Sequence, residues 1–275
     1  MRWFLAVGAM LGVAAACSSF DSSDDGPGAS VDAGASEASP DVLTADDAGG
    51  DGGVDPDGSC AGDAHFLCED FASTQLPSPA WTTKDQGLPG AFELSTERST
   101  SPPRSLLFTV AGDSGSSAGH AQLVKSVPPQ LRKLRCAYSM YPEILTTNGS
   151  DGSLIFTMFL DGNSTSGLSR TSFVLSATKS ASSAIVYNYF PDGGPTSAEG
   201  TNALGLPLDT WSRITVAIDL DARSVDVTAN GASLISFGFT GAQVPSHNGG
   251  EMRFGITSAS GETKFYLDDI VCDWD

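Results

Sequence analysis

The chain has 275 residues, and its 33 aspartates and glutamates against 14 lysines and arginines give a formal net charge of −19. This balance argues against a nucleic-acid-binding protein, because binding to a phosphate backbone requires a clustered basic surface. The acids are unevenly placed: residues 18–59 contain eleven acids and no base, whereas residues 60–275 contain 22 acids and 13 bases. The second part is rich enough in Val, Ile, Leu and Phe to bury one sizeable core, so we expect a single folded domain there.

The first sixteen residues have the pattern of a secretory signal peptide. A short positive start, Met1-Arg2, precedes the apolar run Trp3–Ala16. That run is too short to cross a bilayer, which takes about 20 residues. We therefore expect residues 1–16 to be a cleaved signal and not a membrane span.

The residues at the expected cleavage point resemble a lipoprotein signal. Ala14-Ala15-Ala16-Cys17 is similar to the bacterial lipobox, in which the cysteine is lipidated and becomes the mature N-terminus. The resemblance implies a lipid anchor on Cys17. Ser18 after the cysteine is similar to the signal for the outer membrane of a Gram-negative bacterium, on its periplasmic face or at the cell surface. The alternative is ordinary signal cleavage without lipid.

The segment after Cys17 has the composition of an unfolded spacer. From Ser18 to Ser59 it consists mainly of Asp, Gly, Ala, Ser and Pro, with almost no large apolar residue. Such a segment cannot bury enough surface to offset the entropy lost on ordering. We predict that residues 17–59 form a lipidated, disordered acidic tether and that the domain spans residues 60–275.

Four cysteines remain in the expected domain: Cys60, Cys68, Cys136 and Cys272. An even number in an exported chain indicates disulfides, and four cysteines allow three pairings. Cys60 and Cys68 are close together at the start of the domain, whereas Cys136 and Cys272 lie in two separate strand-like runs. We favour the pairings 60–68 and 136–272. A cysteine metal site is disfavoured because the chain has no Cys-x-x-Cys motif.

Residues 60–275 have the pattern of an all-β domain. No segment shows the 3.6-residue periodicity of an amphipathic helix, and short runs alternate with Gly, Asp, Asn, Ser and Pro. So many short strands predict a two-sheet antiparallel sandwich or jelly roll. The expected strands are 66–71, 91–96, 105–111, 121–127, 134–141, 153–160, 171–177, 184–190, 211–220, 224–229, 252–257 and 264–272.

The strands expected at 211–220 and 224–229 form the clearest pair. Branched apolar residues alternate with other residues in both, and Asp221-Ala222 between them has turn composition. This pattern predicts an antiparallel hairpin with one buried and one wetter face.

Four segments, in their order and spacing, resemble a known family. Trp211–Asp219 followed by Val225-Asp226-Val227 and Asn230-Gly231 is similar to a hairpin of laminin-G-like, concanavalin A-like domains, and Phe265–Val271 is similar to their closing strand. Phe66–Phe71 resembles the first strand of exported bacterial members, and Ser101–Leu106 the entry to a later one. The resemblance covers about residues 60–275 and implies a jelly-roll sandwich. It implies no single activity, because this fold carries lectins, glycosidases, lyases and interaction modules.

No catalytic motif of the enzymes on this fold is present in the sequence. The E-x-D-x-x-E pattern that aims two carboxylates at a glycosidic bond does not occur, and neither does the Q-I-H strand motif of jelly-roll lyases. We therefore expect a non-catalytic module, displayed from the cell envelope, that binds carbohydrate or another envelope component. A polysaccharide lyase or glycosidase, and a structural adhesion or protein-interaction module, are the alternatives.

Two pairs of acids are candidate calcium ligands. Glu69-Asp70 lies on the first expected strand and Asp268-Asp269 on the last. In sandwiches of the resembled family the terminal strands lie side by side, which would bring these carboxylates together and require a neutralising cation or arginine. The resemblance thus implies a structural Ca²⁺ ion. Alternatively, the acids accept hydrogen bonds from the backbone or from an arginine.

Aromatic residues on the central strands are the candidate ligand-binding residues. Aromatic faces stack on sugar rings while polar neighbours bind hydroxyl groups. The alternative is that Tyr187 and Tyr189 belong to the core, with their hydroxyls satisfied at its edge. The candidates are Tyr138, Tyr187, Asn188 and Tyr189, with Tyr141 and Arg170 nearby in sequence.

Overall fold

The computed structural model describes residues 60, 65–76, 78–111, 119–145, 153–164, 167–178, 180–189, 196–202, 205–240, 246–259 and 261–275. These residues belong to one compact unit, Gly50–Asp275. The expected signal peptide, Cys17 and the tether up to residue 59 lie outside the described residues. The described part of the chain contains no helix that is long and apolar enough to cross a membrane.

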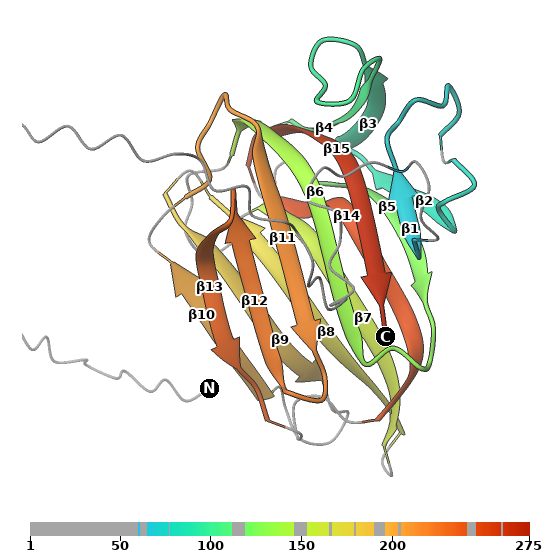
Figure 1. Ribbon diagram of the computed structural model, residues 1–275, viewed down its shortest axis with the longest axis vertical. Coiled ribbons are helices and arrows are strands. Elements are labelled where there is room, and N and C mark those ends of the chain that lie inside the picture. Colours follow the sequence, from blue (N-terminus) through green and yellow to red (C-terminus); the bar gives the residue numbers. More distant parts are fainter. Residues whose placement is uncertain are drawn as a thin grey trace, which may run out of the picture. The chain divides into compact units, whose positions relative to one another are not determined.

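One sheet has eight strands and lies in front in Figure 1. Its strands are β1 (Leu67–Glu69), β3 (Gly90–Ser95), β4 (Ser105–Val110), β6 (Lys133–Ile144), β11 (Ser212–Asp219), β12 (Ser224–Ala229), β13 (Ala232–Gly238) and β15 (Thr263–Trp274). The order is β13-β12-β11-β6-β15-β4-β3, and β1 also pairs with β15. The first and last strands of the domain therefore lie side by side, as the sequence predicts.

The second sheet has seven strands and lies behind the first (Figure 1). Its strands are β2 (Thr83–Gly87), β5 (Gly119–Val127), β7 (Ser153–Ser164), β8 (Gly167–Ala177), β9 (Ser182–Tyr189), β10 (Thr196–Asn202) and β14 (His247–Ala259). Their order is β10-β9-β8-β7-β14-β5-β2, and all pairings in both sheets are antiparallel. The predicted all-β, two-sheet antiparallel fold is confirmed.

The core fills the space between the two sheets with aromatic and branched side chains. The ring of Phe254 on β14 meets Trp81, Tyr138 and Phe156 edge to face, with centroids 5.8, 5.4 and 5.1 Å away. Tyr138 comes from the front sheet and Phe156 from the back one, so these contacts join the two layers. Burying one such side chain contributes about 1.5–3 kcal/mol to the stability of the fold, and edge-to-face packing of the rings adds to this stability.

The hairpin predicted from alternation is confirmed as β11 and β12, which pair from Ile214↔Ala229 to Asp219↔Ser224. The inward side chains of β11 alternate with half-buried ones along the whole strand. The next turn uses Asn230 and Gly231, whose φ angles of 50° and 77° suit asparagine and glycine. The Asn230 side chain also accepts a hydrogen bond from the Arg213 backbone N–H, which ties the turn to β11.

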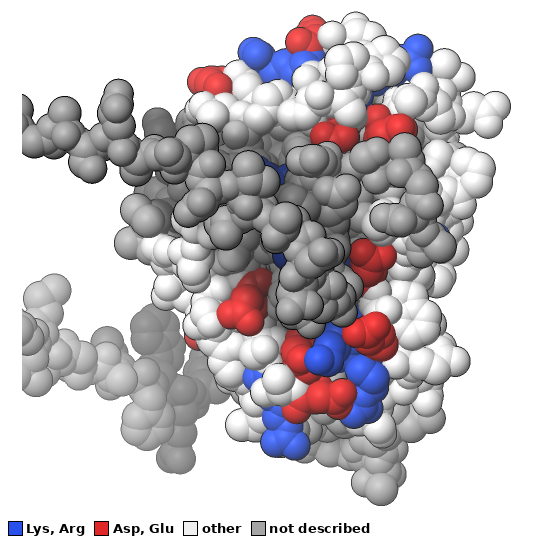
Figure 2. All heavy atoms as spheres, viewed as in Figure 1, with Lys and Arg blue, Asp and Glu red and all other residues white. Residues whose placement is uncertain are grey.

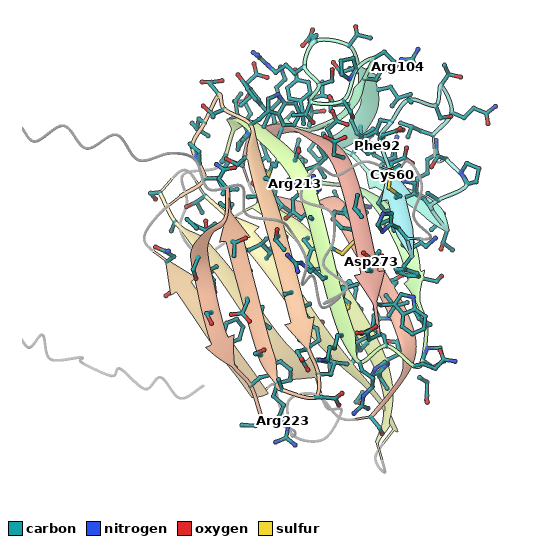
Figure 3. The ribbon with its side chains drawn as sticks, viewed as in Figure 1. Cys60, Phe92, Arg104, Arg213, Arg223 and Asp273 are labelled. Carbon is teal, nitrogen blue, oxygen red and sulfur yellow. A yellow bond between two sulfur atoms is a disulfide. The ribbon has the colours of Figure 1, made fainter. Side chains whose placement is uncertain are left out.

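Both expected disulfides are present, so the favoured pairing is confirmed. Cys60 and Cys68 are joined beside β1, and Cys136 and Cys272 are joined across the neighbouring strands β6 and β15 (Figure 3). Cys136 and Cys272 face the core and are completely buried. The second disulfide therefore fastens the last strand to the middle of the front sheet.

Candidate functional site

The outer face of the seven-stranded sheet carries the most distinctive group of side chains. On β14, Met252 and Phe254 point into the core, so Glu251 and Arg253 lie on the opposite, outer face. On β7 the core residues Met158 and Leu160 likewise leave Phe159 on that outer face. Strand register places Glu251 opposite Phe159. Charged groups and an aromatic ring therefore meet in the middle of this face.

The Phe159 ring lies between two guanidinium groups. The Cζ atoms of Arg170 and Arg253 are each 5.0 Å from the ring centroid. An ion pair orients each arginine: Arg170 donates from Nε and Nη2 to Asp161 at 2.8 and 3.4 Å, and Arg253 donates from Nε and Nη2 to Glu251. The hydrogen bond to Asp161 raises the pKa of Arg170. The two cations are thus held in place by the ring and by their acids.

A polar network continues this face toward its edge at β2. Gln122 on β5 donates from Nε2 to Asp85 on β2 at 2.8 Å, and the Nε2 atom of His120 lies 3.3 Å from the other oxygen of Asp85. The hydrogen bond from Gln122 holds the pKa of Asp85 below its ordinary value; the charges of His120 and Arg253 act in the same direction and partial burial opposes them. Within the described residues the buried Gln122 Oε1 has no hydrogen-bond partner.

The position of His120 depends on a glycine on the neighbouring strand. Gly87 pairs with His120, and a β-carbon at Gly87 would lie 2.3 Å from His120 Cε1. Glycine at this position therefore lets the imidazole lie directly against β2. The network Asp85–Gln122–His120 offers a hydrogen-bond acceptor and an imidazole next to the arginine pair.

Three of the four candidate ligand residues lie on a neighbouring strand of the same sheet. On β9, Tyr189 pairs with Arg170 and Tyr187 with Ser172, and Asn188 lies between them. Their backbone is described; their side chains are not. Tyr141, by contrast, belongs to a cluster with Leu107 and Tyr266 on the outer face of the other sheet.

The expectation for Tyr138 is wrong, because this tyrosine is completely buried in the core. Its ring packs edge to face on Phe254, and its hydroxyl has no partner among the described residues. Burial raises the pKa of that hydroxyl. Tyr138 therefore contributes to packing and not to a ligand surface.

The carboxylates of the first pair of candidate calcium ligands, Glu69 and Asp70, accept hydrogen bonds from other groups of the protein. The buried carboxylate of Glu69 accepts hydrogen bonds from the Phe71 backbone N–H at 3.0 Å, the Trp81 indole N–H at 3.0 Å and the Ser78 hydroxyl. Asp70 accepts one local bond from the backbone N–H of Ala72. Glu69 thus fastens the segment between β1 and β2 to the end of β1.

The second pair holds the connection between β3 and β4. Asp268, which is completely buried, accepts from Thr100 N at 2.7 Å, Ser101 N at 3.0 Å, and both of their hydroxyls. Asp269, with a φ angle of 48°, accepts from the Thr100 hydroxyl at 2.6 Å. Burial raises the pKa of Asp268 above its ordinary value, and its hydrogen bonds oppose this shift.

The four acids therefore do not gather into one cation site. Among the described residues there is no group of three or more His, Cys, Asp or Glu side chains that could hold a metal ion. Glu69, Asp70 and Asp268 instead accept hydrogen bonds from backbone N–H groups, which is the alternative expected from the sequence. Calcium binding by the chain stays a prediction.

The outer face of the eight-stranded sheet has a different charge pattern. Figure 2 shows basic and acidic side chains intermixed at the lower end of this face, where β6 and β12 begin. In the described part of the face the lysines and arginines form no continuous basic patch.

No family model and no curated protein matches the chain. Solved structures are similar to it in fold. An endo-β-1,4-glucuronan lyase from the fungus Trichoderma reesei has a TM-score of 0.57 at 10% identity, with 77% of this chain and 96% of that chain covered. A cellulose-induced protein has a TM-score of 0.46 at 14% identity (70% of this chain and 91% of that chain covered). A Bacillus subtilis protein of unknown function with a galectin-like fold has a TM-score of 0.42 at 12% identity (77% and 97% covered). The first similarity shows a shared β-sandwich fold.

Proposed function

From this jelly-roll-like fold, we propose that the chain is a carbohydrate-binding module displayed from the cell envelope, with its ligand on the outer face of the seven-stranded sheet. The observation that carries the proposal is the Phe159 ring held between Arg170 and Arg253. Aromatic and guanidinium groups side by side on a sheet face provide an apolar surface for a sugar ring and donors for its oxygens.

The arginines keep donors for a ligand. Each uses Nε and Nη2 for its own acid, and no contact among the described residues uses Nη1 of either one. A guanidinium has five N–H donors in a planar fork that suits carboxylates. Two such groups on one face favour a sugar that carries a carboxylate, such as a uronate.

The second candidate function is a polysaccharide lyase, favoured by the Asp85–Gln122–His120 network on the same face. A lyase removes the proton next to the uronate carboxylate, expels the glycosidic oxygen and leaves an unsaturated sugar. This chemistry requires a base and groups that neutralise the carboxylate. In this reading His120 is the base, Asp85 orients it, and Gln122 with Arg253 binds the carboxylate. The likeness to a glucuronan lyase supports this candidate through the fold alone.

Phe159→Ala and Arg253→Ala are each expected to weaken glycan binding by tenfold or more, that is by about 1.4 kcal/mol or more. The measurement is a glycan array followed by titration calorimetry on the full chain carrying Cys17→Ser. Arg104→Ala is the matched control. Arg104 lies at the end of the β3–β4 connection, and its only contacts among the described residues are with the backbone oxygens of Ala72 and Ser73. Equal binding by all four proteins would contradict the proposed face.

The same preparation separates the remaining alternatives. Incubation with a panel of uronate polysaccharides tests for a lyase. If the protein releases unsaturated sugar ends and His120→Ala does not, the lyase would replace the binding module as the proposed function. A blank array together with capture of an envelope protein would favour the adhesion or interaction module. Repeating the array with a chelator tests the expected Ca²⁺, whose removal should weaken binding if the ion is present.

Anchoring is part of the proposal and has its own test. A lipid on Cys17 and an acidic spacer up to residue 59 would hold the domain away from the outer membrane, facing the periplasm or the outside. Cys17→Ser is expected to abolish incorporation of a labelled fatty acid and to release the protein from membranes. Incorporation of the labelled fatty acid into the Cys17→Ser protein would contradict a lipid anchor on Cys17.

A further inference from the structure

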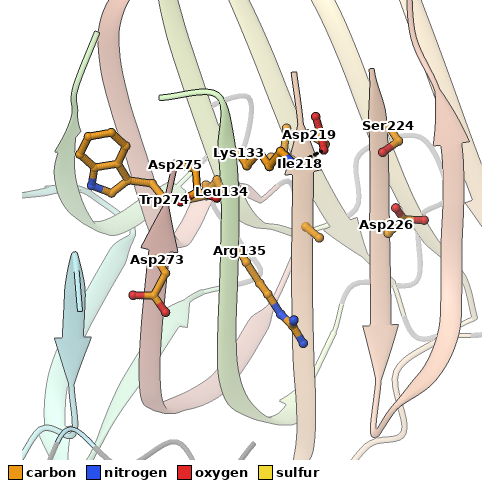
Figure 4. Close-up of a pocket in the computed structure, with 11 residues that line it drawn as sticks. Lys133, Leu134, Arg135, Ile218, Asp219, Ser224, Asp226, Asp273, Trp274 and Asp275 are labelled. Atoms are coloured by element: carbon orange, nitrogen blue, oxygen red, sulfur yellow. Dashed lines mark ion pairs between the residues drawn. The ribbon is translucent and has the colours of Figure 1, made fainter. Parts of the chain in front are cut away.

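We propose that the outer face of the eight-stranded sheet carries a second ligand site, specific for an uncharged sugar unit. The site is a hollow of about 340 Å³ where β6, β11, β12 and β15 lie side by side (Figure 4). This volume is at the small end of the range of small-molecule sites, about 300–1,000 Å³. The inference is independent of the proposed function, because the two sites lie on opposite faces of the sandwich.

The hollow exists because a small residue lies between two long ones. Ala217 on β11 pairs with Arg135 on β6 and with Asp226 on β12. All three side chains point away from the core, since Ile218 and Val216 on either side of Ala217 are buried in it. Figure 4 shows Arg135 extending from β6 toward β11, with Asp226 on the strand beyond. Ala217 is therefore the floor, and the two charged side chains are the walls.

Arg135 supplies hydrogen-bond donors that no described residue uses. The side chain is exposed, and in the described part of the chain it makes no hydrogen bond, ion pair or ring contact. Arg132, close by in sequence, is by contrast paired with Asp221. A guanidinium at the side of a hollow, with no N–H group bound by the described residues, is a ready donor to ligand oxygens.

The acids around the hollow supply acceptors. Asp226 accepts from the Ser236 hydroxyl at 2.6 Å, and Asp273 on β15 is 3.0 Å from His65 Nδ1. In each case the contact uses one carboxylate oxygen, Oδ1, and no contact among the described residues uses the other. A ligand in the hollow must therefore both accept from Arg135 and donate to Asp226 or Asp273. Neighbouring hydroxyl groups of a sugar do both.

The charge of the lining selects among sugars. Two basic side chains, Lys133 and Arg135, are outnumbered by four aspartates, Asp219, Asp226, Asp273 and Asp275. A uronate would be repelled by this excess, whereas an uncharged sugar would not. Trp274 also lines the hollow, with 38% of its surface exposed, and packs edge to face on Phe66. Its indole lies on the Phe66 side of β15, away from Arg135 (Figure 4), so the part of the hollow beside Arg135 is formed by the polar side chains and by Ala217.

The test follows the backbone N–H signals of Asp226 and Asp273 in nitrogen-15 spectra of the full chain carrying Cys17→Ser. The probes are the methyl glycosides of glucose, galactose and mannose, with sodium glucuronate as the charged comparison. We expect a saturable shift with at least one methyl glycoside and none with glucuronate. Ala217→Leu, which fills the hollow without changing its charge, should raise the dissociation constant at least about tenfold, and so should Arg135→Ala.

Matched variants make the result decisive. Thr215→Leu adds an equally large side chain on the same face of β11 but outside the lining, and it should bind as the parent does. Phe159→Ala, on the opposite face, should also leave this shift unchanged, so that failure of the proposed function does not affect the test. No shift with any methyl glycoside, a stronger shift with glucuronate, or unchanged binding by both Ala217→Leu and Arg135→Ala would each overturn the second site.

Discussion

Replacing Cys136 and Cys272 together by alanine is expected to lower the free energy of unfolding by about 5 kcal/mol. The two cysteines are 136 residues apart in sequence, so their disulfide closes a long loop and removes much of the entropy of the unfolded chain. Both sulfur atoms are also buried between the sheets, and their loss leaves a small void. Equilibrium unfolding in urea, monitored by tryptophan fluorescence, measures the change.

The other disulfide is the natural control for this prediction. Cys60 and Cys68 are eight residues apart, and the same loop-entropy relation gives about 2.5 kcal/mol for their removal. The double replacement of Cys60 and Cys68 should therefore cost about half as much. A cost for the short loop equal to or above that of the long one would contradict the entropic explanation.

Asp268→Ala is expected to destabilise the domain by about 3 kcal/mol, because it leaves several donors without an acceptor. The backbone N–H groups and the hydroxyls of Thr100 and Ser101 all donate to this buried carboxylate. The control is Asp70→Ala, which removes a single exposed bond to Ala72 and should cost less than about 1 kcal/mol. Urea unfolding of both variants provides the comparison, and equal costs would contradict it.

The pH dependence of Asp268 gives a second check on the same residue. Burial raises the pKa of Asp268, so the folded chain holds this proton to a higher pH than the unfolded chain does. The protonated form therefore favours folding. As the pH rises from about 4 through the folded pKa, the parent should lose stability relative to Asp268→Asn, which cannot ionise. A difference that stays constant across this range would contradict the raised pKa.

The strands that the sequence failed to predict are edge strands. β10 and β2 are the two ends of the seven-stranded sheet, and β13 is one end of the other. Edge strands bury little: four of the five residues of β2 are exposed. The interior strands were predictable because burial on one side imposes an alternation of apolar residues, as in β11. β2 has no such alternation, whereas the edge strand β3 alternates in burial and was predictable.

The misplacement of Tyr138 has an identifiable cause. Cys136 was expected to form a disulfide with another strand, and Tyr138 is two residues later on the same strand. Residues two apart on a strand share a face, so a buried Cys136 puts Tyr138 in the core as well. The sequence contains this information in the spacing of Cys136 and Tyr138, whereas the residue type alone does not distinguish a core tyrosine from a ligand-binding one.

The group around Phe159 could not be found from the sequence. Phe159 stands in an almost wholly apolar run, Leu154–Leu160, which does not reveal the side that faces solvent. Its contact with Arg170 depends on the register of β7 with the next strand, β8, and its contact with Arg253 depends on the pairing of β7 with β14, which lies far away along the chain. The acids of β1 and β15 show the same limit: the adjacency of the strands was predictable, but the loop that Asp268 binds was not.

The two disulfides also determine how the domain responds to a pull on the chain ahead of Cys60. The load passes through the Cys60–Cys68 bond into β1, whose three residues pair with β15. Once this short ladder parts, the load continues along the chain to β2, at the edge of the other sheet, while β15 stays covalently joined to β6 through Cys136–Cys272. A pull on this part of the chain would therefore detach edge strands first and leave β6 and β15 joined in the middle of the front sheet.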